Sequence, residues 1–185
     1  MNENRNPWQT LSSKVVYDNP WIHVVEHQVI HPAGSEGIYG VVQYKNIATG
    51  VIPLDEENNT WLVGQYRYPL EQYSWEIPEG GGAKGADPLI AVQRELREET
   101  GITAKDWQLI QVMHLSNSVS DEIAYLYIAR DLTFGETEHE DSEELAIRKV
   151  PFSEVYRMVL EGEITDTMTV TAVLRAALVL DAGAK

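Results

Sequence analysis

The sequence predicts an α+β fold, and three observations support this expectation. Short β-rich runs bounded by turn residues fill much of the chain before residue 130. Helical periodicity is confined to three segments, and strands and helices do not alternate as they do in a doubly wound sheet. With 185 residues, 43% of them apolar, the chain can form one sizeable core, or a core with a small appendage; two full-sized domains would be crowded.

The N-terminal part of the chain has the pattern of a three-stranded antiparallel module. Strands are expected at residues 15–17, 22–30 and 38–44, which are rich in β-branched and aromatic side chains. Proline-containing turns at 18–20 and 32–34 separate them.

Further elements follow along the chain. Four more strands are expected, at residues 50–54, 61–66, 108–114 and 123–129. A helix at 88–100 has both ends marked, because Asp87 can cap it, Pro88 suits its first position and Gly101 supplies the stop. Two later helices are expected, at 153–160 with Ser153 as its cap, and at 166–180.

The composition is strongly acidic. There are 14 Lys and Arg against 29 Asp and Glu, so the net charge is 14 − 29 = −15. Such a chain repels phosphate backbones and anionic membrane surfaces, and we therefore expect neither nucleic acid nor a membrane as a partner. The excess charge either keeps a soluble protein apart from its neighbours or holds divalent cations, and composition alone does not decide between the two.

Cysteine is absent, which excludes disulfides, thiol nucleophiles and cysteine-ligated zinc. No run approaches the roughly 18 apolar residues that span a bilayer, and residues 1–9 lack the basic flank and apolar stretch of a signal peptide. We expect a cytoplasmic protein.

Three glutamates give the predicted helix at 88–100 a chemically distinctive face. Glu95 is three residues from Glu98 and four from Glu99, a spacing that brings helical side chains together. Carboxylates this close oppose folding unless a cation neutralises them, and such ligands suit Mg²⁺ or Mn²⁺. The alternative is an ordinary solvated helix face. The sequence Pro-Glu-Gly-Gly-Gly at 78–82, expected to be a flexible loop able to approach a phosphate or a metal, favours the metal site.

Gly80 and residues 94–102 resemble the Nudix box, G-x5-E-x7-R-E-U-x-E-E-x-G-U, in which U is an aliphatic residue. Every fixed position is filled except one, where the box has a glutamate and this chain has Ala86. In the family that glutamate commonly pairs with the arginine of the box. Its absence here therefore affects the anchoring of Arg94 more than the chemistry of the site. Asp87 or Glu98 could compensate.

The resemblance extends to the ADP-ribose and nucleoside diphosphate sugar pyrophosphatase branch of the Nudix family. Residues 65–69, Gln-Tyr-Arg-Tyr-Pro, and 75–80, Trp-Glu-Ile-Pro-Glu-Gly, are similar to the signature of that branch, and the similarity runs from about residue 15 to residue 180. It implies a Nudix α/β/α sandwich at residues 48–185. The N-terminal antiparallel β module, residues 1–47, would then serve dimerisation and base binding.

The resemblance also implies roles around the box. Glu95 and Glu99 would be the main ligands of Mg²⁺ or Mn²⁺. Glu98 would be an auxiliary ligand, and the backbone carbonyl of Glu79 a further one. Arg94 would orient the glutamates.

A general base is expected in the acid-rich loop at 136–144, which holds six acids in nine residues. The resemblance places the base in a loop before the penultimate helix, and Glu140 is the first candidate, with Glu143 next. Most of the six acids would only solvate the loop.

Residues expected to contact the substrate come from several parts of the chain. Arg67 would grip a phosphate or the terminal sugar, unless it is an exposed strand-end charge. Glu76 would hydrogen-bond a ribose hydroxyl or, alternatively, face water. Trp21 would stack on the base or pack in the core, and Gly80 would let the backbone approach the substrate. Polar residues at 118–122 would line the pocket or simply form a turn.

Three histidines, His23, His27 and His31, are spaced as metal ligands would be on a helix. Their segment is predicted to be a strand, where they would stand roughly 13 Å apart. We therefore expect no shared metal there.

The resemblance implies metal-dependent hydrolysis of the pyrophosphate bond of nucleoside diphosphate sugars, with ADP-ribose as the first substrate to test. The products would be a nucleoside monophosphate and a sugar phosphate. Two alternatives stay open: a Nudix hydrolase of dinucleoside polyphosphates or nucleoside triphosphates, and a nucleotide-sugar sensor without turnover. Relatives in this branch are usually homodimers, so a homodimer is expected.

Overall fold

The structure is a computed structural model that describes residues 5–137 and 145–183, and it contains two compact units. The first unit is Met1–Asn46 with His114–Ile123, and the second is Ile47–Met113 with Ala124–Lys185. The functional roles expected for residues 1–47 and 48–185 remain predictions.

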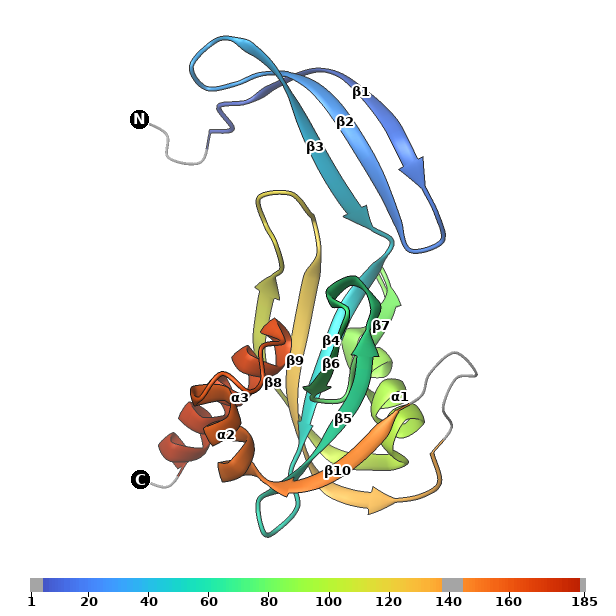
Figure 1. The fold of residues 1–185 in the computed structure, drawn as a ribbon, viewed down its shortest axis with the longest axis vertical. Coiled ribbons are helices and arrows are strands. Elements are labelled where there is room, and N and C mark those ends of the chain that lie inside the picture. The colour runs from blue at the N-terminus through green and yellow to red at the C-terminus, as the bar shows by residue number, and fades with distance from the viewer. Residues whose placement is uncertain (1–4, 138–144, 184–185) are drawn as a thin grey trace. The chain divides into compact units, whose positions relative to one another are not determined.

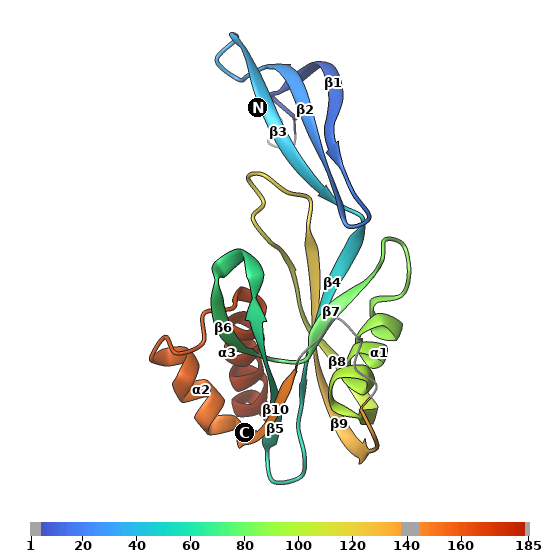
Figure 2. The same ribbon diagram turned by 45° about the vertical axis from the view of Figure 1, so that its right-hand side comes forward.

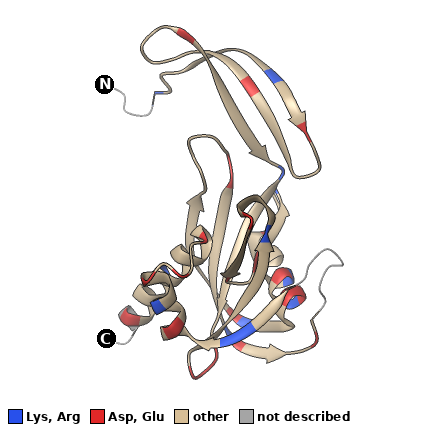
Figure 3. Ribbon diagram, in the orientation of Figure 1, with Lys and Arg blue, Asp and Glu red and all other residues tan. Residues whose placement is uncertain are grey.

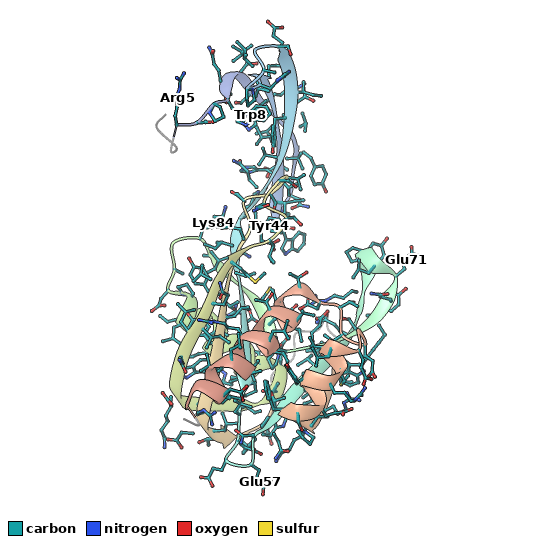
Figure 4. The ribbon with its side chains drawn as sticks, turned by 90° about the vertical axis from the view of Figure 1, so that its left-hand side faces the viewer. Arg5, Trp8, Tyr44, Glu57, Glu71 and Lys84 are labelled. Atoms are coloured by element: carbon teal, nitrogen blue, oxygen red, sulfur yellow. The ribbon has the colours of Figure 1, made fainter. Side chains whose placement is uncertain are left out.

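The first unit is built on a three-stranded antiparallel sheet with the order β1-β2-β3. Its strands are β1 (Gln9–Asp18), β2 (Ile22–Ile30) and β3 (Glu36–Tyr44), drawn in shades of blue in Figure 1. The predicted N-terminal module is confirmed, with a first strand longer than expected. Trp8, which Figure 4 labels in this unit, packs edge-on against Tyr39 with ring centroids 5.2 Å apart.

Residues 114–123 join the first unit through contacts with β3. The Tyr39 hydroxyl donates to the Ser118 carbonyl at 2.7 Å, and the Tyr44 amide donates to Asp121 Oδ1 at 2.9 Å. Val42 and Ser120 form an isolated parallel bridge. The polar groups of this turn thus serve the local structure.

The histidines His23, His27 and His31 each have a side-chain hydrogen-bond neighbour of their own in this unit. The pairs are His23 with Gln43, His27 with Ser13 and His31 with Ser35. His23 and His27 lie in the strand β2, as predicted for their segment.

The second unit contains two sheets. One has the order β7-β4-β9-β8, with β4 and β9 parallel, and the other has the order β10-β5-β6, with antiparallel pairs. The strands are β4 (Asn46–Pro53), β5 (Asn59–Arg67), β6 (Gln72–Glu76), β7 (Glu79–Ala83), β8 (Ile102–His114), β9 (Ile123–Phe134) and β10 (Ala146–Pro151).

Helices cover the strands of this unit from two sides. Figures 1 and 2 show α1 (Pro88–Thr100) on one side, and α2 (Phe152–Leu160) and α3 (Thr167–Gly183) on the other. This layering agrees with the predicted α+β class and with an α/β/α sandwich. Among the described residues, no helix has the length and apolarity that would let it traverse a bilayer.

The core beneath α1 joins this helix to four strands, including β5 through Trp61. Val92 and Leu96 of α1 are fully buried against Val51 of β4 and Tyr127 of β9, with Ile102 at the start of β8. The helix therefore lies on the sheet through its apolar stripe, and its remaining face is available for the glutamates.

Two local predictions are wrong. Residues 78–82 were expected to be a flexible loop, but Glu79–Ala83 is the strand β7. Glycine is usually disfavoured in strands, yet here it lets the strand approach α1 closely. Ser153 was expected to cap α2, but the helix begins at Phe152 without a side-chain cap, because the Phe152 amide donates to the Asn58 carbonyl instead.

Three strands were not predicted: β6, β7 and β10. The short 3-10 helix at Tyr68–Leu70, which joins β5 to β6, was not predicted either. The strands β7 and β10 pair with strands distant in the chain, β4 and β5, whereas β6 pairs with β5 directly before it.

Candidate functional site

The site begins with the close packing of β7 against α1. A Cβ atom at Gly80 would overlap Cδ of Glu95, and a Cβ atom at Gly82 would lie 2.7 Å from Cβ of Ala91. Both approaches are closer than any side chain tolerates, so glycine at these positions is what allows the contact. At the other end of α1, Gly101 has φ of 70° and closes the helix.

Two glutamates of α1 bind the outer edge of β7. The Glu79 amide donates to Glu99 Oε2 at 3.0 Å, and the Gly81 amide donates to Glu95 Oε1 at 3.1 Å. Residues two apart in a strand are separated by about 6.6–6.8 Å, and residues four apart in a helix by about 6.0 Å along its axis. The two spacings match, so one strand edge anchors both carboxylates.

This arrangement also orients a backbone carbonyl. In a strand, the N–H and C=O of one residue point to the same edge. Because the Glu79 amide faces Glu99, its carbonyl faces the α1 side too. The Glu79 carbonyl, which the sequence analysis proposed as a metal ligand, therefore lies on the edge of β7 that binds Glu95 and Glu99.

Arg94 is held by three acceptors. Its Nη2 donates to the Gly81 carbonyl at 2.7 Å and to Glu95 Oε1 at 2.6 Å, and its Nη1 donates to Glu98 Oε2 at 3.0 Å. Arg94, Glu95, Glu98 and Glu99 are thus gathered on β7 and on one helix face. Basic and acidic segments lie side by side on α1 in Figure 3.

The departure from the Nudix box at Ala86 leaves the arginine anchored. Ala86 lies in the turn between β7 and α1, where its amide donates to the Ala83 carbonyl. Of the two substitutes considered, Asp87 accepts from the Leu89 amide at 2.9 Å and so caps α1, whereas Glu98 binds Arg94.

Arg67, at the end of β5, reaches across to two carboxylates. Its Nε donates to both oxygens of Glu76, at 2.9 and 3.0 Å, and its Nη2 donates to Glu76 Oε2 at 2.5 Å and to Glu79 Oε1 at 2.6 Å. Glu76 is only 2% exposed, so it does not face water. Arg67 is half-buried and ion-paired, which differs from a free strand-end charge.

The charges of this second group affect its titration. Burial raises the pKa of the Glu79 carboxyl well above its usual range, and the negative charges of Asp166 and Glu76 raise it further, against the opposing effect of Arg67. Burial acts to lower the pKa of Arg67, but its hydrogen bonds to Glu76 and the charge of Glu79 outweigh burial and raise that pKa.

Sequence reasoning did not find two members of this group: the Glu79 side chain and Asp166. One oxygen of Asp166 lies within 4.8 Å of carboxylate oxygens of Glu76 and Glu79. Asp166 is also the residue before α3, where its Oδ2 accepts from the Thr169 amide at 2.6 Å. Its place at a helix start was visible in the sequence, but its approach to β6 and β7 depends on tertiary packing, in which Thr169 Oγ1 accepts from the Ile77 amide.

Among the described residues, the sequence-predicted Trp21 is not part of these groups. Trp21 belongs to the first unit, in the turn between β1 and β2, and it is 65% exposed, so it does not pack in a core. Glu140 and Glu143 lie outside the described residues.

Comparison with known proteins shows the family to which the chain belongs. A model of the NUDIX domain matches residues 44–168, more than half of the chain, and a model of the nucleoside diphosphate sugar hydrolase N-terminal domain matches residues 8–42. The chain belongs to the Nudix family. The recognition made from the sequence is confirmed, and the Nudix box is the segment that spans β7 and α1.

Individual Nudix relatives match over most of their length. The chain is 30% identical to an ADP-ribose pyrophosphatase of Mycobacterium tuberculosis, covering 90% of this chain and 82% of the relative. It is 29% identical to an ADP-ribose pyrophosphatase of Bacillus subtilis, covering 89% and 90%. The crystal structure of an ADP compounds hydrolase has the same fold, with a TM-score of 0.85 over 95% of both chains at 19% identity.

The residues on β7 and α1 fit the divalent metal on which Nudix hydrolases generally depend. The donor set consists of hard carboxylate oxygens, which Mg²⁺ and Mn²⁺ prefer. Glu99, which is 4% exposed, and Glu95 are each anchored through one oxygen by β7. A carboxylate has two oxygens and about four acceptor positions, so anchoring does not prevent it from binding a metal.

Proposed function

We propose that this Nudix hydrolase cleaves the pyrophosphate bond of nucleoside diphosphate sugars, with ADP-ribose as its first substrate. The observation that carries the proposal is the anchored carboxylate face of α1 against β7. Similarity to ADP-ribose pyrophosphatases over about nine tenths of the chain supports the choice of substrate. The products are a nucleoside monophosphate and a sugar phosphate.

Glu95 and Glu99 hold Mg²⁺ or Mn²⁺ in this proposal, with Glu98 as an auxiliary ligand and the Glu79 carbonyl as a further one. The bound metal polarises phosphoryl oxygens and lowers the pKa of the attacking water. Arg94 fixes the directions of Glu95 and Glu98 through its hydrogen bonds. This preorganisation reduces the reorganisation that the reaction would otherwise require.

Arg67 and Glu76 are assigned to the substrate. Arg67 is 35% exposed at its side chain, so part of its guanidinium is accessible, and its planar geometry suits phosphate oxygens. Glu76 holds Arg67 from the buried side. Gly80 keeps the space in which the Glu95 carboxylate lies.

The general base is assigned to the acidic loop at 136–144, with Glu140 first and Glu143 next. A carboxylate in this loop accepts the proton of the attacking water. Trp21, which is largely exposed, is assigned to stacking on the base of the nucleotide.

We propose that the protein forms a homodimer and that it is cytoplasmic. All ten residues of β1 are exposed, including the apolar Leu11, Val15, Val16 and Tyr17. Apolar side chains gathered on one exposed strand are typical of an interface. Similarity to the branch whose members usually pair through the N-terminal module supports the same assignment.

A substrate panel tests the proposed function. Purified protein with Mg²⁺ or Mn²⁺ is assayed on ADP-ribose, other sugar nucleotides, nucleoside triphosphates and dinucleoside polyphosphates, and products are identified by chromatography. We expect turnover of ADP-ribose to AMP and ribose phosphate. Turnover of triphosphates alone would overturn the substrate class, and binding without turnover would make the protein a sensor.

A further inference from the structure

A second acidic group lies beside the carboxylates of α1 but contains none of them. One carboxylate oxygen from each of Glu76, Glu79 and Asp166 lies within 4.8 Å of the other two. The three residues come from the end of β6, the start of β7 and the position before α3. Two strand ends that are close in sequence and a helix start about ninety residues later therefore place their carboxylates together.

The Glu79 side chain is not fully satisfied there. It is nine-tenths buried, and its Oε1 accepts from Arg67 Nη2 at 2.6 Å. Its Oε2 is shielded from water, and among the described residues no donor hydrogen-bonds to it. A buried carboxylate oxygen without a partner costs free energy, so such an atom indicates a missing cationic or donor group.

The charges of the group point to the same conclusion. Glu76 and Glu79 are ion-paired with Arg67, so the three carboxylates, when all are ionised, and this guanidinium have a net charge of 1 − 3 = −2. One divalent cation would balance this charge. Arg67 binds Glu76 and Oε1 of Glu79, but it forms no hydrogen bond with Oε2 of Glu79.

The spacing of the oxygens suits a hard divalent cation. Ligands on opposite sides of Mg²⁺ stand about 4.0–4.2 Å apart, and on opposite sides of Ca²⁺ about 4.6–5.2 Å apart. The distances between the three carboxylate oxygens are at most 4.8 Å, which is compatible with both ranges. Two segments are also fixed to each other, since the Ile77 amide of the β6–β7 connection donates to Thr169 of α3 at 3.0 Å.

We propose that Glu76, Glu79 and Asp166 form a divalent-cation site of their own, separate from the carboxylates of α1. Glu79 then serves two sites, the first through its backbone and the second through its side chain. Arg67 contacts this second site, so a cation there holds the carboxylates that orient Arg67.

Counting bound Mn²⁺ on the full chain tests the site without substrate. Free Mn²⁺ is measured by electron paramagnetic resonance in titrations of the wild type and of Glu79→Gln and Asp166→Asn. Both variants keep a hydrogen-bonding side chain of the same size, and Asn remains a good helix cap. We expect each variant to bind about one ion fewer per chain than the wild type.

The matched control is Glu71→Gln, which removes one negative charge from the exposed connection between β5 and β6 in the same unit (Figure 4). It should leave the ion count unchanged. Glu99→Gln should lose a different ion, so its loss and that of Asp166→Asn should add in the double variant. Circular dichroism confirms that each variant is folded.

Three results would overturn the site: equal counts in the wild type and in folded Asp166→Asn, an equal loss in Glu71→Gln, or no additivity with Glu99→Gln. The count needs no turnover. Failure of this site therefore leaves the proposed hydrolysis standing, and failure of the hydrolysis leaves the site standing.

Discussion

At the scale of single residues, Gly80 has the most restrictive surroundings. The Glu95 carboxylate fills the space where a side chain would begin, with its Cδ and both oxygens within 2.5 Å of the position that a Cβ atom would take. The glycine of the Nudix box is therefore needed for the position that the Glu95 carboxylate takes beside β7, in addition to any approach of a substrate.

Gly80→Ala should displace Glu95 and destabilise the protein. Overpacking of this kind costs about 1–3 kcal/mol, and the shift of a carboxylate that we assign to the metal should lower kcat strongly. Chemical denaturation gives the free energy of unfolding, and an ADP-ribose assay gives kcat.

Gly40→Ala is the control, because nothing lies within 4 Å of a Cβ atom at that position on β3. It should leave both quantities close to those of the wild type. A Gly80→Ala variant as stable and as active as Gly40→Ala would contradict the contact.

The residue scale also shows where sequence reasoning reaches its limit. The Nudix box revealed Arg94, Glu95, Glu98 and Glu99, because their spacing within one helix is a local pattern. The partners of Arg67 could not be read in this way, since Glu76 and Glu79 reach it across β5, β6 and β7. Their contact depends on strand pairing, which single-sequence patterns do not specify.

At the scale of elements, the turn between β4 and β5 depends on Asp55. Its Oδ1 accepts from the amides of Glu57 at 3.0 Å and Asn59 at 2.8 Å, and its Oδ2 binds Lys149 of β10 at 2.8 Å. Burial acts to raise the pKa of Asp55, but hydrogen bonds from Lys149 and Asn59 outweigh it and lower that pKa to about 2.

The free energy of unfolding should therefore decrease in acid, and protonation of Asp55 should account for part of that decrease. A carboxyl whose pKa is lowered by folding stabilises the protein above its unfolded pKa of about 3.9, and this stabilisation is lost as the pH falls from about 4 to about 2. Denaturation of Asp55→Asn should show a weaker pH dependence over this interval than the wild type. Parallel curves would contradict the role of Asp55.

Asp55→Ala should be more severe at neutral pH. It leaves two turn amides and Lys149 without their acceptor, and losing hydrogen bonds to a charged group costs about 1.5–3 kcal/mol. The free energy of unfolding at pH 7 measures this cost. Glu56→Ala, an exposed neighbour in the same turn, should change it by less than about 0.5 kcal/mol.

The helices and β7 show how element predictions succeeded and failed. The helix at 88–100 was predicted with both ends correct, because Asp87 and Gly101 mark them locally and the structure uses both. The run at 78–82 was interpreted from its glycines as a loop. Packing against α1 overrode that preference, and the strand β7 resulted.

At the scale of the whole molecule, the net charge of −15 has at least two structural uses. Some of the carboxylates lie together on α1, and others form the group of Glu76, Glu79 and Asp166 next to Arg67. A chain of this charge that hydrolyses phosphate compounds needs cations to reduce the repulsion between the site and its substrate.

Oligomeric state is a prediction at this scale. Analytical ultracentrifugation at micromolar concentration should give the mass of two chains, and Val15→Glu on β1 should shift the distribution toward one chain because it places a charge among apolar residues. A monomeric wild type would remove the homodimer assignment.

The central claim, that the anchored carboxylates of α1 carry metal-dependent hydrolysis, is tested most directly by the rate of ADP-ribose hydrolysis in Glu99→Gln. The Gln side chain can still accept from the Glu79 amide, so the fold and nucleotide binding should persist, whereas the metal loses a charged ligand. With Mg²⁺ saturating, we expect kcat to fall at least about 100-fold, which corresponds to about 2.7 kcal/mol. A rate close to that of the wild type would contradict the account.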